Sequence, residues 1–326
     1  MKRVDFFIAG NSKSGTTALY KFLAQHPGIC MSEPKEPNYF ATDFSHDEET
    51  GAFTEKSEEE YHDFFDDPTR SKVWGEASAC YLYSRDAARA IARYNPSAQI
   101  IIILREPVSF LYSYFLQLLE NVRSEGEVEK DFERALGLEP KRKQGHAIPD
   151  ECLVPQMLFY RERIRYADQL ARFLDCFDAS QVKVFLYEDF KEDNRWIVRD
   201  VLDFLGVDSD AEIEYGTHNK GHELRSKRLQ RFVYDLSHGQ GGLGAAKAVI
   251  RRMLPKRARK SLMRGAYSTL VFRPKRGLDP DLARQLKEEF LPEVIKVGEL
   301  LGQDLAQRWG YETARVSGEQ TRILEA

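Results

Sequence analysis

Continuous apolar runs alternate with amphipathic stretches along most of the chain. Four short runs are unbroken and rich in β-branched or aromatic residues, which is typical of buried strands in a parallel sheet. These predicted strands span 4–9, 73–76, 99–104 and 182–187. Apolar residues also recur at helical spacing, and they predict helices at 16–25, 85–94, 107–121, 154–177, 194–205 and 279–301. Because strands and helices alternate, the pattern predicts an α/β fold with a parallel sheet and helices on its faces.

Two stretches lack such a pattern. Residues 30–72 are polar, acidic and irregular, with one amphipathic piece near 58–65. Residues 123–152 are charged and contain several glycines and prolines, so we expect partly mobile loops there, with a short helix at 131–136. Ligands of parallel α/β sheets bind at the C-terminal ends of the strands, which makes the loops after 4–9 and 99–104 the first candidates for a site.

The composition indicates a protein with a sizeable core and no strong overall charge. Of the 326 residues, 42% are hydrophobic, and the formal net charge is −4. The four cysteines have neither metal-ligand nor Cys-x-x-Cys spacing, which favours free thiols in a reducing compartment. No run is long and apolar enough for a membrane span or the core of a signal peptide. We therefore expect a soluble, cytoplasmic protein.

The loop after the first predicted strand is similar to a phosphate-binding loop with a displaced cation. Gly10, Gly15 and Thr17 fit the spacing of such a loop, but Thr16 stands where a triphosphate site has its lysine, and Lys13 comes earlier. A glycine-bearing turn before a helix still offers backbone N–H groups and the positive end of the helix dipole. The pattern favours a phosphate ligand without magnesium, and a turn without any ligand is the alternative.

A second candidate anion site follows the Ile-rich strand at 99–104. Arg105 directly follows this strand, and Ser113 lies about two helical turns further on. An arginine fork and a hydroxyl can converge on one phosphate. Taken singly, Arg105 could form an ion pair with Glu106, and Ser113 could be an ordinary serine on a helix face. Their combination beside a phosphate loop favours an anion site.

These residues resemble motifs of the sulfotransferases that use 3′-phosphoadenosine 5′-phosphosulfate (PAPS), in particular the bacterial and carbohydrate-type members. Lys13-Ser14-Gly15-Thr16-Thr17 matches the family's K-S-G-T-T loop, and Arg105-Glu106-Pro107 with Ser113 matches its R-[DE]-P-x(5)-S element. Similarity extends through the segments HPGICMSEPKEPNYF, GEASACYLYS, VFLYEDF and NKGHELRSK. The resemblance implies a single sulfotransferase domain over 1–326, with a P-loop-type parallel sheet flanked by helices.

The resemblance also implies how the donor is held. The K-S-G-T-T loop binds the 5′-phosphosulfate, and Lys13 neutralises the charge that grows on the bridging oxygen as the S–O bond breaks. No metal is required. The other implied contacts to the nucleotide are Arg105 and Ser113 at the 3′-phosphate, Tyr187 near the adenine, and Lys220 and Gly221 in a late covering loop.

The acceptor side is implied less completely. In glycan-modifying relatives the general base is a glutamate in the K-E-P run, which here is Glu36. Glu76 is the competing carboxylate, able to orient Lys13 or the acceptor, and His146 could line the acceptor entrance in the predicted mobile loop at 123–152. The expected acceptor is a hydroxyl of a glycan, a glycolipid or a small metabolite. Heparan-type relatives have a lysine near the Ala77 position, and its absence argues against a heparan-like polyanion.

Residues 215–276 are expected to hold the nucleotide-covering loop and a basic helical segment. Between 247 and 276 there are eleven Lys and Arg residues and no acidic residue. A solvated helix over the nucleotide is the first interpretation, while contact with anionic lipid or with an acidic acceptor is the alternative. Nucleic acid is disfavoured because no aromatic stacking platform accompanies the charges. Two competing functions stay open, a P-loop enzyme acting on nucleoside triphosphates and a non-catalytic module that binds nucleotide or membrane.

Overall fold

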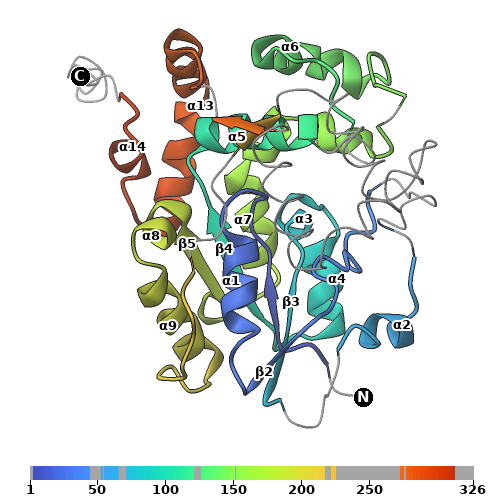
Figure 1. Cartoon of the computed structure of the whole chain (residues 1–326), viewed down its shortest axis with the longest axis vertical. Coiled ribbons are helices and arrows are strands. Elements are labelled where there is room, and N and C mark those ends of the chain that lie inside the picture. The colour runs from blue at the N-terminus through green and yellow to red at the C-terminus, as the bar shows by residue number, and fades with distance from the viewer. Residues whose placement is uncertain are drawn as a thin grey trace, which may run out of the picture.

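A five-stranded parallel sheet forms the centre of the molecule in the computed structural model (Figure 1), which describes residues 3–44, 53, 55–65, 71–120, 126–150, 152–216, 222–224, 272–274 and 277–312. Its strands are β1 (Phe6–Ile8), β2 (Ile29–Met31), β3 (Val73–Ala77), β4 (Gln99–Leu104) and β5 (Val182–Leu186), in the spatial order β2-β3-β1-β4-β5. The predicted fold class is confirmed, because every pairing in this sheet is parallel.

The parallel register brings the loops after β1, β3 and β4 to one edge of the sheet. Ile8 of the central strand β1 pairs with Ala77 of β3 on one side and with Ile101 of β4 on the other. At the far side of β4, Leu104 pairs with Leu186 of β5. Residues that follow these paired positions are therefore neighbours in space, although the paired positions are 69 to 93 residues apart in sequence.

Helices cover both faces of the sheet. One face packs against α1 (Thr16–Leu23), α8 (Tyr187–Glu192) and α9 (Asn194–Leu205). The other packs against α3 (Cys80–Tyr83), α4 (Ala87–Tyr94), α5 (Pro107–Glu120), α7 (Tyr166–Leu174) and α13 (Pro280–Leu301). In β4, Ile101 and Ile103 point to the first face, and Ile100, Ile102 and Leu104 point to the second. Each of these fully buried side chains contributes roughly 1.5–3 kcal/mol of transfer free energy.

The smaller elements lie at the periphery of this core. The described helices and strands not yet given are α2 (Glu58–His62), α6 (Phe132–Lys143), α14 (Leu305–Arg308), the 3-10 turns Pro155–Leu158, Arg161–Ile164 and Ala179–Gln181, and the strands β6 (His222–Leu224) and β7 (Phe272–Pro274). β6 and β7 form an antiparallel ribbon, and β6 lies against α5. In the described part of the chain, no helix has the length and hydrophobicity needed to cross a membrane.

The structure corrects two of the predicted helices. The segment 154–177 was expected to be one helical stripe, but it divides into two 3-10 turns followed by α7. Apolar spacing cannot distinguish these arrangements, because both bury the same residues. The helix predicted at 131–136 is too short, since α6 continues to Lys143 through Gly137 and Pro140. Pro140 lacks the N–H that would bond to the carbonyl of Leu136, and Arg161 Nη1 donates to this carbonyl instead at 2.9 Å.

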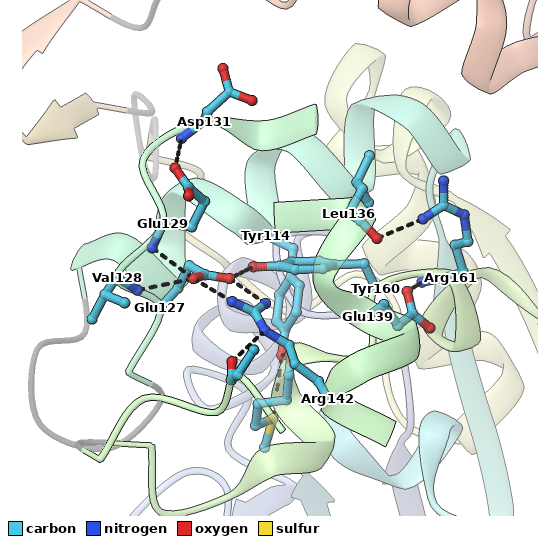
Figure 2. Close-up of polar contacts among 12 residues, drawn as sticks. Tyr114, Glu127, Val128, Glu129, Asp131, Leu136, Glu139, Arg142, Tyr160 and Arg161 are labelled. Atoms are coloured by element: carbon cyan, nitrogen blue, oxygen red, sulfur yellow. Dashed lines mark hydrogen bonds and ion pairs between the residues drawn. The ribbon is translucent and has the colours of Figure 1, made fainter. Parts of the chain in front are cut away.

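A buried ion pair holds the segment that contains α6 (Figure 2). Glu127 and Arg142 have exposed fractions of 0% and 1%, and the guanidinium donates two hydrogen bonds to the carboxylate, at 2.7 and 2.8 Å. The Tyr160 hydroxyl and the backbone N–H groups of Val128 and Glu129 complete the shell around Glu127. Residues 126–150 are thus tied to the core at both ends of α6, whereas their predicted mobility and acceptor role stay predictions.

Candidate active site

The loop between β1 and α1 is shaped by two glycines. Gly15 caps α1 with φ 89°, a left-handed conformation that favours glycine, and a Cβ there would lie 2.8 Å from the ring of Phe190. A Cβ on Gly10 would lie 3.0 Å from the backbone nitrogen of Ile103 in β4. The chain can therefore turn tightly from the strand into the helix, and the N–H groups of Thr16 and Thr17 in the first turn of α1 have no partner within the helix.

Polar side-chain atoms in this loop are buried without a protein partner. Ser14 is fully buried, and neither its Oγ nor the Nδ2 of Asn11 has a hydrogen-bond partner in the described structure. Buried polar groups are nearly always paired in folded proteins, and these two atoms are free to bind a ligand; similar atoms occur elsewhere, at Arg163 Nε and Gln169 Oε1. Asn11 was not among the residues singled out from the sequence, because it falls at a variable position of the motif.

Lys13 occupies the outer turn of the same loop. Its backbone has φ 62°, which costs a residue other than glycine about 1–2 kcal/mol. Its carbonyl oxygen accepts a hydrogen bond from Arg105 Nη1 at 2.8 Å, and its side chain is exposed. Such backbone strain persists where the surroundings fix it, often at functional sites. The backbone of Lys13 is thus fixed by Arg105, and its side chain is open to solvent.

Arg105 joins this loop to the ends of β4 and β5. Its guanidinium lies over the ring of Tyr187 at 4.6 Å, and its Nε is buried without a partner. Tyr187 begins α8 directly after β5, and it also approaches Gly15, where a Cβ would lie 3.5 Å from its ring. Gly15, Arg105 and Tyr187, which were all predicted to bind the nucleotide, therefore come together at one edge of the sheet. Stacking on the tyrosine ring stabilises the position of the Arg105 guanidinium.

Ser113 lies on α5, and it is buried with 4% of its surface exposed. Glu106 was the alternative ion-pair partner of Arg105, but its carboxylate accepts hydrogen bonds from the N–H groups of Val108 and Ser109 at 2.9 and 2.7 Å. The Tyr311 hydroxyl donates to the same carboxylate at 2.7 Å. Glu106 therefore caps α5, which leaves the Arg105 guanidinium to its contacts with Lys13 and Tyr187.

The late basic loop is described only at its margins. Lys220, Gly221 and nearly all of the basic segment 247–276 lie outside the described residues. The strand β6 starts at His222, immediately after Gly221, and its backbone lies against α5, the helix that bears Ser113. Part of the predicted covering segment therefore lies against the helix that bears Ser113.

Glu36 lies at the C-terminal end of β3, next to the loop that follows β1. Its backbone N–H donates to the carbonyl of Ala77 at 3.1 Å, and Ala77 pairs with Ile8, the last residue of β1. The Glu36 carboxylate forms an ion pair with Lys35 and has a side-chain exposure of 46%. With φ 66°, Glu36 shares the left-handed backbone of Lys13. An exposed carboxylate at this edge can accept a proton from an incoming acceptor.

Glu76 has a different setting from Glu36. It is fully buried, and it accepts hydrogen bonds from the hydroxyls of Tyr61 at 2.6 Å and Ser78 at 2.5 Å. Burial raises the pKa of the Glu76 carboxyl from 4.5 to about 7, although these hydrogen bonds oppose the shift. Its position favours a role inside the protein over direct contact with an acceptor. His146, the other substrate candidate, is exposed beyond the end of α6, and no contact joins it to Glu36 or Lys13 among the described residues.

A loop of N–H donors with a nearby lysine, beside an arginine stacked on tyrosine, can bind a nucleotide that carries phosphate groups at two ends. The neighbouring carboxylate adds a candidate base. In the described part of the chain, no group of three or more His, Cys, Asp or Glu residues is arranged to hold a metal ion. The fold and the site together define a group-transfer enzyme with an anionic nucleotide donor.

The comparisons with known proteins give the family. Residues 3–236 match the model of the sulfotransferase domain. The chain belongs to the sulfotransferase family, and its class is that of the PAPS-dependent sulfotransferases. A solved sulfotransferase from Alicyclobacillus acidocaldarius superposes with a TM-score of 0.67 at 27% identity, covering 95% of this chain and 100% of that chain.

The similar curated proteins are much longer than this chain. A bifunctional heparan sulfate N-deacetylase/N-sulfotransferase 4 of Mus musculus is 30% identical over 211 residues, which is 62% of this chain and 22% of the relative. A bifunctional heparan sulfate N-deacetylase/N-sulfotransferase 3 of Homo sapiens is 28% identical over 209 residues, again 62% of this chain and 22% of the relative. The chain thus spans about a fifth of the length of these relatives.

Proposed function

We propose that this chain transfers a sulfuryl group from PAPS to a hydroxyl of a glycan, a glycolipid or a small metabolite, with Lys13 at the leaving group and Glu36 as the general base. The observation that carries the proposal is the register of β1, β3 and β4. It places the Lys13 loop between the residues that end its two neighbouring strands, with Arg105 on one side and the Glu36 loop on the other. A donor held by Lys13 and Arg105 therefore lies beside the candidate base.

The reaction moves one group and one proton. The acceptor oxygen attacks the sulfur of the bound phosphosulfate while its proton passes to the Glu36 carboxylate. The bond between sulfur and the bridging oxygen breaks on the opposite side, and its electrons leave with adenosine 3′,5′-bisphosphate. Lys13 and the N–H groups at the start of α1 stabilise the charge that develops on this oxygen. Positioning and electrostatic stabilisation supply the catalysis, as in phosphoryl transfer.

The choice of acceptor rests on the names of the curated relatives and on one position of the sequence. The names of the curated relatives describe heparan sulfate N-sulfotransferases, so these proteins act on an amine of a polysaccharide. The family resemblance implies that heparan-type relatives have a glycan-contacting lysine near the position of Ala77, and this chain has alanine there. A less acidic glycan, a glycolipid or a small metabolite with a free hydroxyl fits this difference better than heparan sulfate itself.

A transfer assay with sulfur-labelled PAPS tests the proposal. The acceptors are N-acetylheparosan, de-N-acetylated heparosan, a neutral glycolipid and a simple phenol. We expect label in a hydroxyl acceptor, with loss of labelling in Glu36→Gln and in Lys13→Ala. Label only in the de-N-acetylated glycan would show that the acceptor group is an amine and not a hydroxyl. Wild-type rates in Glu36→Gln would show that Glu36 is not the base. Magnesium-dependent binding of ATP with no competition by adenosine 3′,5′-bisphosphate would contradict the donor.

A further inference from the structure

The loop that carries Glu36 has an irregular backbone. Glu36 and Asn38 have φ values of 66° and 56°, although neither is glycine, and the residues around them form no helix or strand. A loop of this kind does not keep its shape through regular backbone pairing. Two left-handed residues so close together need contacts from elsewhere in the protein to remain in place.

Those contacts come from one short segment that begins at the last residue of β3. Every second N–H group of the loop donates to this segment, once to a carbonyl and twice to a side-chain hydroxyl. The three hydrogen bonds are Glu36 N to Ala77 O at 3.1 Å, Asn38 N to Ser78 Oγ at 3.1 Å and Phe40 N to Tyr81 Oη at 3.2 Å. Two of the three anchors are therefore hydroxyls, which rotate freely unless another group orients them.

Glu76 is the group that orients the Ser78 hydroxyl. Ser78 Oγ donates its single hydrogen to Glu76 Oε1 at 2.5 Å, so that a lone pair of the same oxygen is left to accept from Asn38 N. Tyr61 donates to the other carboxylate oxygen at 2.6 Å, which fixes the plane of the carboxylate. The Tyr81 hydroxyl interacts with the same carboxyl. An ionised carboxylate only accepts hydrogen bonds, so its neighbours must donate to it.

The setting of Glu76 is costly for stability alone. The side chain is fully buried, and the nearby Lys35 forms its ion pair with Glu36 instead. Among the described residues no cation lies at ion-pair distance from Glu76. A buried carboxylate in such a setting is energetically unfavourable, and burial raises the pKa of Glu76 to about 7. Groups perturbed in this way, together with a specific set of hydrogen bonds, concentrate at functional sites.

We infer that Glu76 is a positioning residue for the transfer reaction. Its buried carboxylate fixes the Ser78 hydroxyl, which holds the backbone on the far side of Glu36 and so aims the Glu36 carboxylate at the acceptor. This role rests on the proposed function, because it assigns to Glu76 the geometry of the base. It differs from proton abstraction by Glu76 itself, since a fully buried carboxylate does not contact the acceptor.

Amide hydrogen exchange of the full chain tests the geometric half of this inference without any acceptor. Glu76→Leu removes the acceptor that orients the Ser78 hydroxyl, and Ser78→Ala removes the bridging hydroxyl itself. We expect the Asn38 amide to exchange about tenfold faster in both variants, which corresponds to one lost hydrogen bond. The matched control is Tyr114→Phe, which removes a buried hydroxyl bonded to the carbonyl of Met157 and should leave residues 36–40 unchanged. Unchanged exchange at Asn38 in Glu76→Leu would overturn the inference, whatever the enzyme transfers.

Turnover in two backgrounds tests the functional half. The reaction is the release of adenosine 3′,5′-bisphosphate from PAPS with water as the acceptor. We expect Glu76→Leu to lower the rate at least tenfold in the wild-type background, with an unchanged dissociation constant for the bisphosphate. In the Glu36→Gln background the same change should have little further effect, since no base remains to be aimed. Equal losses in both backgrounds would overturn the positioning role. Wild-type rates in Glu36→Gln alone would instead contradict the proposed base, and the exchange data would still decide the geometry.

Discussion

Glu76 and Glu127 are both fully buried, but the protein treats the two carboxylates differently. Glu127, below α6, faces Arg142 in a bidentate ion pair and also receives a tyrosine hydroxyl and two backbone N–H groups (Figure 2). Glu76, at the end of β3, receives only hydroxyl groups within hydrogen-bond distance in the described structure. The charge of Glu127 is neutralised inside the core, whereas Glu76, beside the candidate active site, has no cation at ion-pair distance in the part of the chain that the structure describes.

The difference separates a structural region from a functional one. Around α6 even the carbonyl freed by Pro140 is satisfied, through Arg161. At the donor loop, Ser14 Oγ, Asn11 Nδ2 and Arg105 Nε are buried without partners. Similar atoms also occur away from this loop, at Arg163 Nε, Gln169 Oε1 and Arg172 Nε, so the contrast between the two regions rests on how each buried carboxylate is paired. The predictions below test this contrast.

The largest effect on stability is expected at the Glu127–Arg142 pair. Arg142→Met leaves a buried carboxylate unpaired, so we expect the free energy of unfolding to fall by about 3–5 kcal/mol. Chemical denaturation measures this change, and Arg134→Met, on the exposed side of the same helix, is the matched control. Adding Glu127→Leu should recover most of the loss, because the unpaired charge is then removed. A loss in Arg142→Met as small as in the control would mean that the buried pair does not hold α6.

Lys13→Ala should affect turnover without affecting the fold. We expect kcat to fall by about 10²–10³-fold, the usual cost of removing one donor that stabilises developing charge. The melting temperature should stay within error of wild type, because the Lys13 side chain is exposed. Lys21→Ala, an exposed lysine in the last turn of α1, is the control and should keep full activity. Unchanged turnover in Lys13→Ala would remove this residue from the chemistry.

The raised pKa of Glu76 should make the free energy of unfolding depend on pH. Because burial raises its pKa to about 7, the folded protein binds a proton that the unfolded chain releases near pH 4.5. Below pH 4.5 this proton adds up to about 3 kcal/mol to the free energy of unfolding. The added stability is lost as pH rises to about 7. Denaturation of wild type and Glu76→Gln across this range measures it, and the variant should lack the decline. Parallel profiles would show that Glu76 does not titrate in this window.

The residues of the donor site could be predicted because they depend on strand ends. Arg105 and Tyr187 directly follow Leu104 and Leu186, which are paired in the parallel register, so their proximity follows from the order of strands and helices. The limits of β4 and α9 were also predicted as observed. In α9 the helix ends at Gly206, which has φ 66° and therefore suits a left-handed cap.

The hydrogen-bond networks could not be predicted in the same way. The bonds from Tyr61 and Ser78 to Glu76, and from Arg142 to Glu127, join residues whose meeting depends on tertiary packing. The sequence of 123–152 is charged and contains glycines, and nothing in it indicates that Glu127 and Arg142 will be buried. This segment was therefore predicted to be mainly loop. The short edge strand β2 was missed because three residues give too little of a pattern.

The most direct test of the account compares two nucleotides on two proteins by calorimetry. Adenosine 3′,5′-bisphosphate and adenosine 5′-phosphate differ only in the 3′-phosphate, which Arg105 and Ser113 are expected to bind. We predict that wild type binds the bisphosphate at least tenfold more tightly, and that Arg105→Ala removes most of this preference, since a hydrogen bond to a charged group is worth about 1.5–3 kcal/mol. Equal affinities of the wild-type protein for both nucleotides would contradict the account.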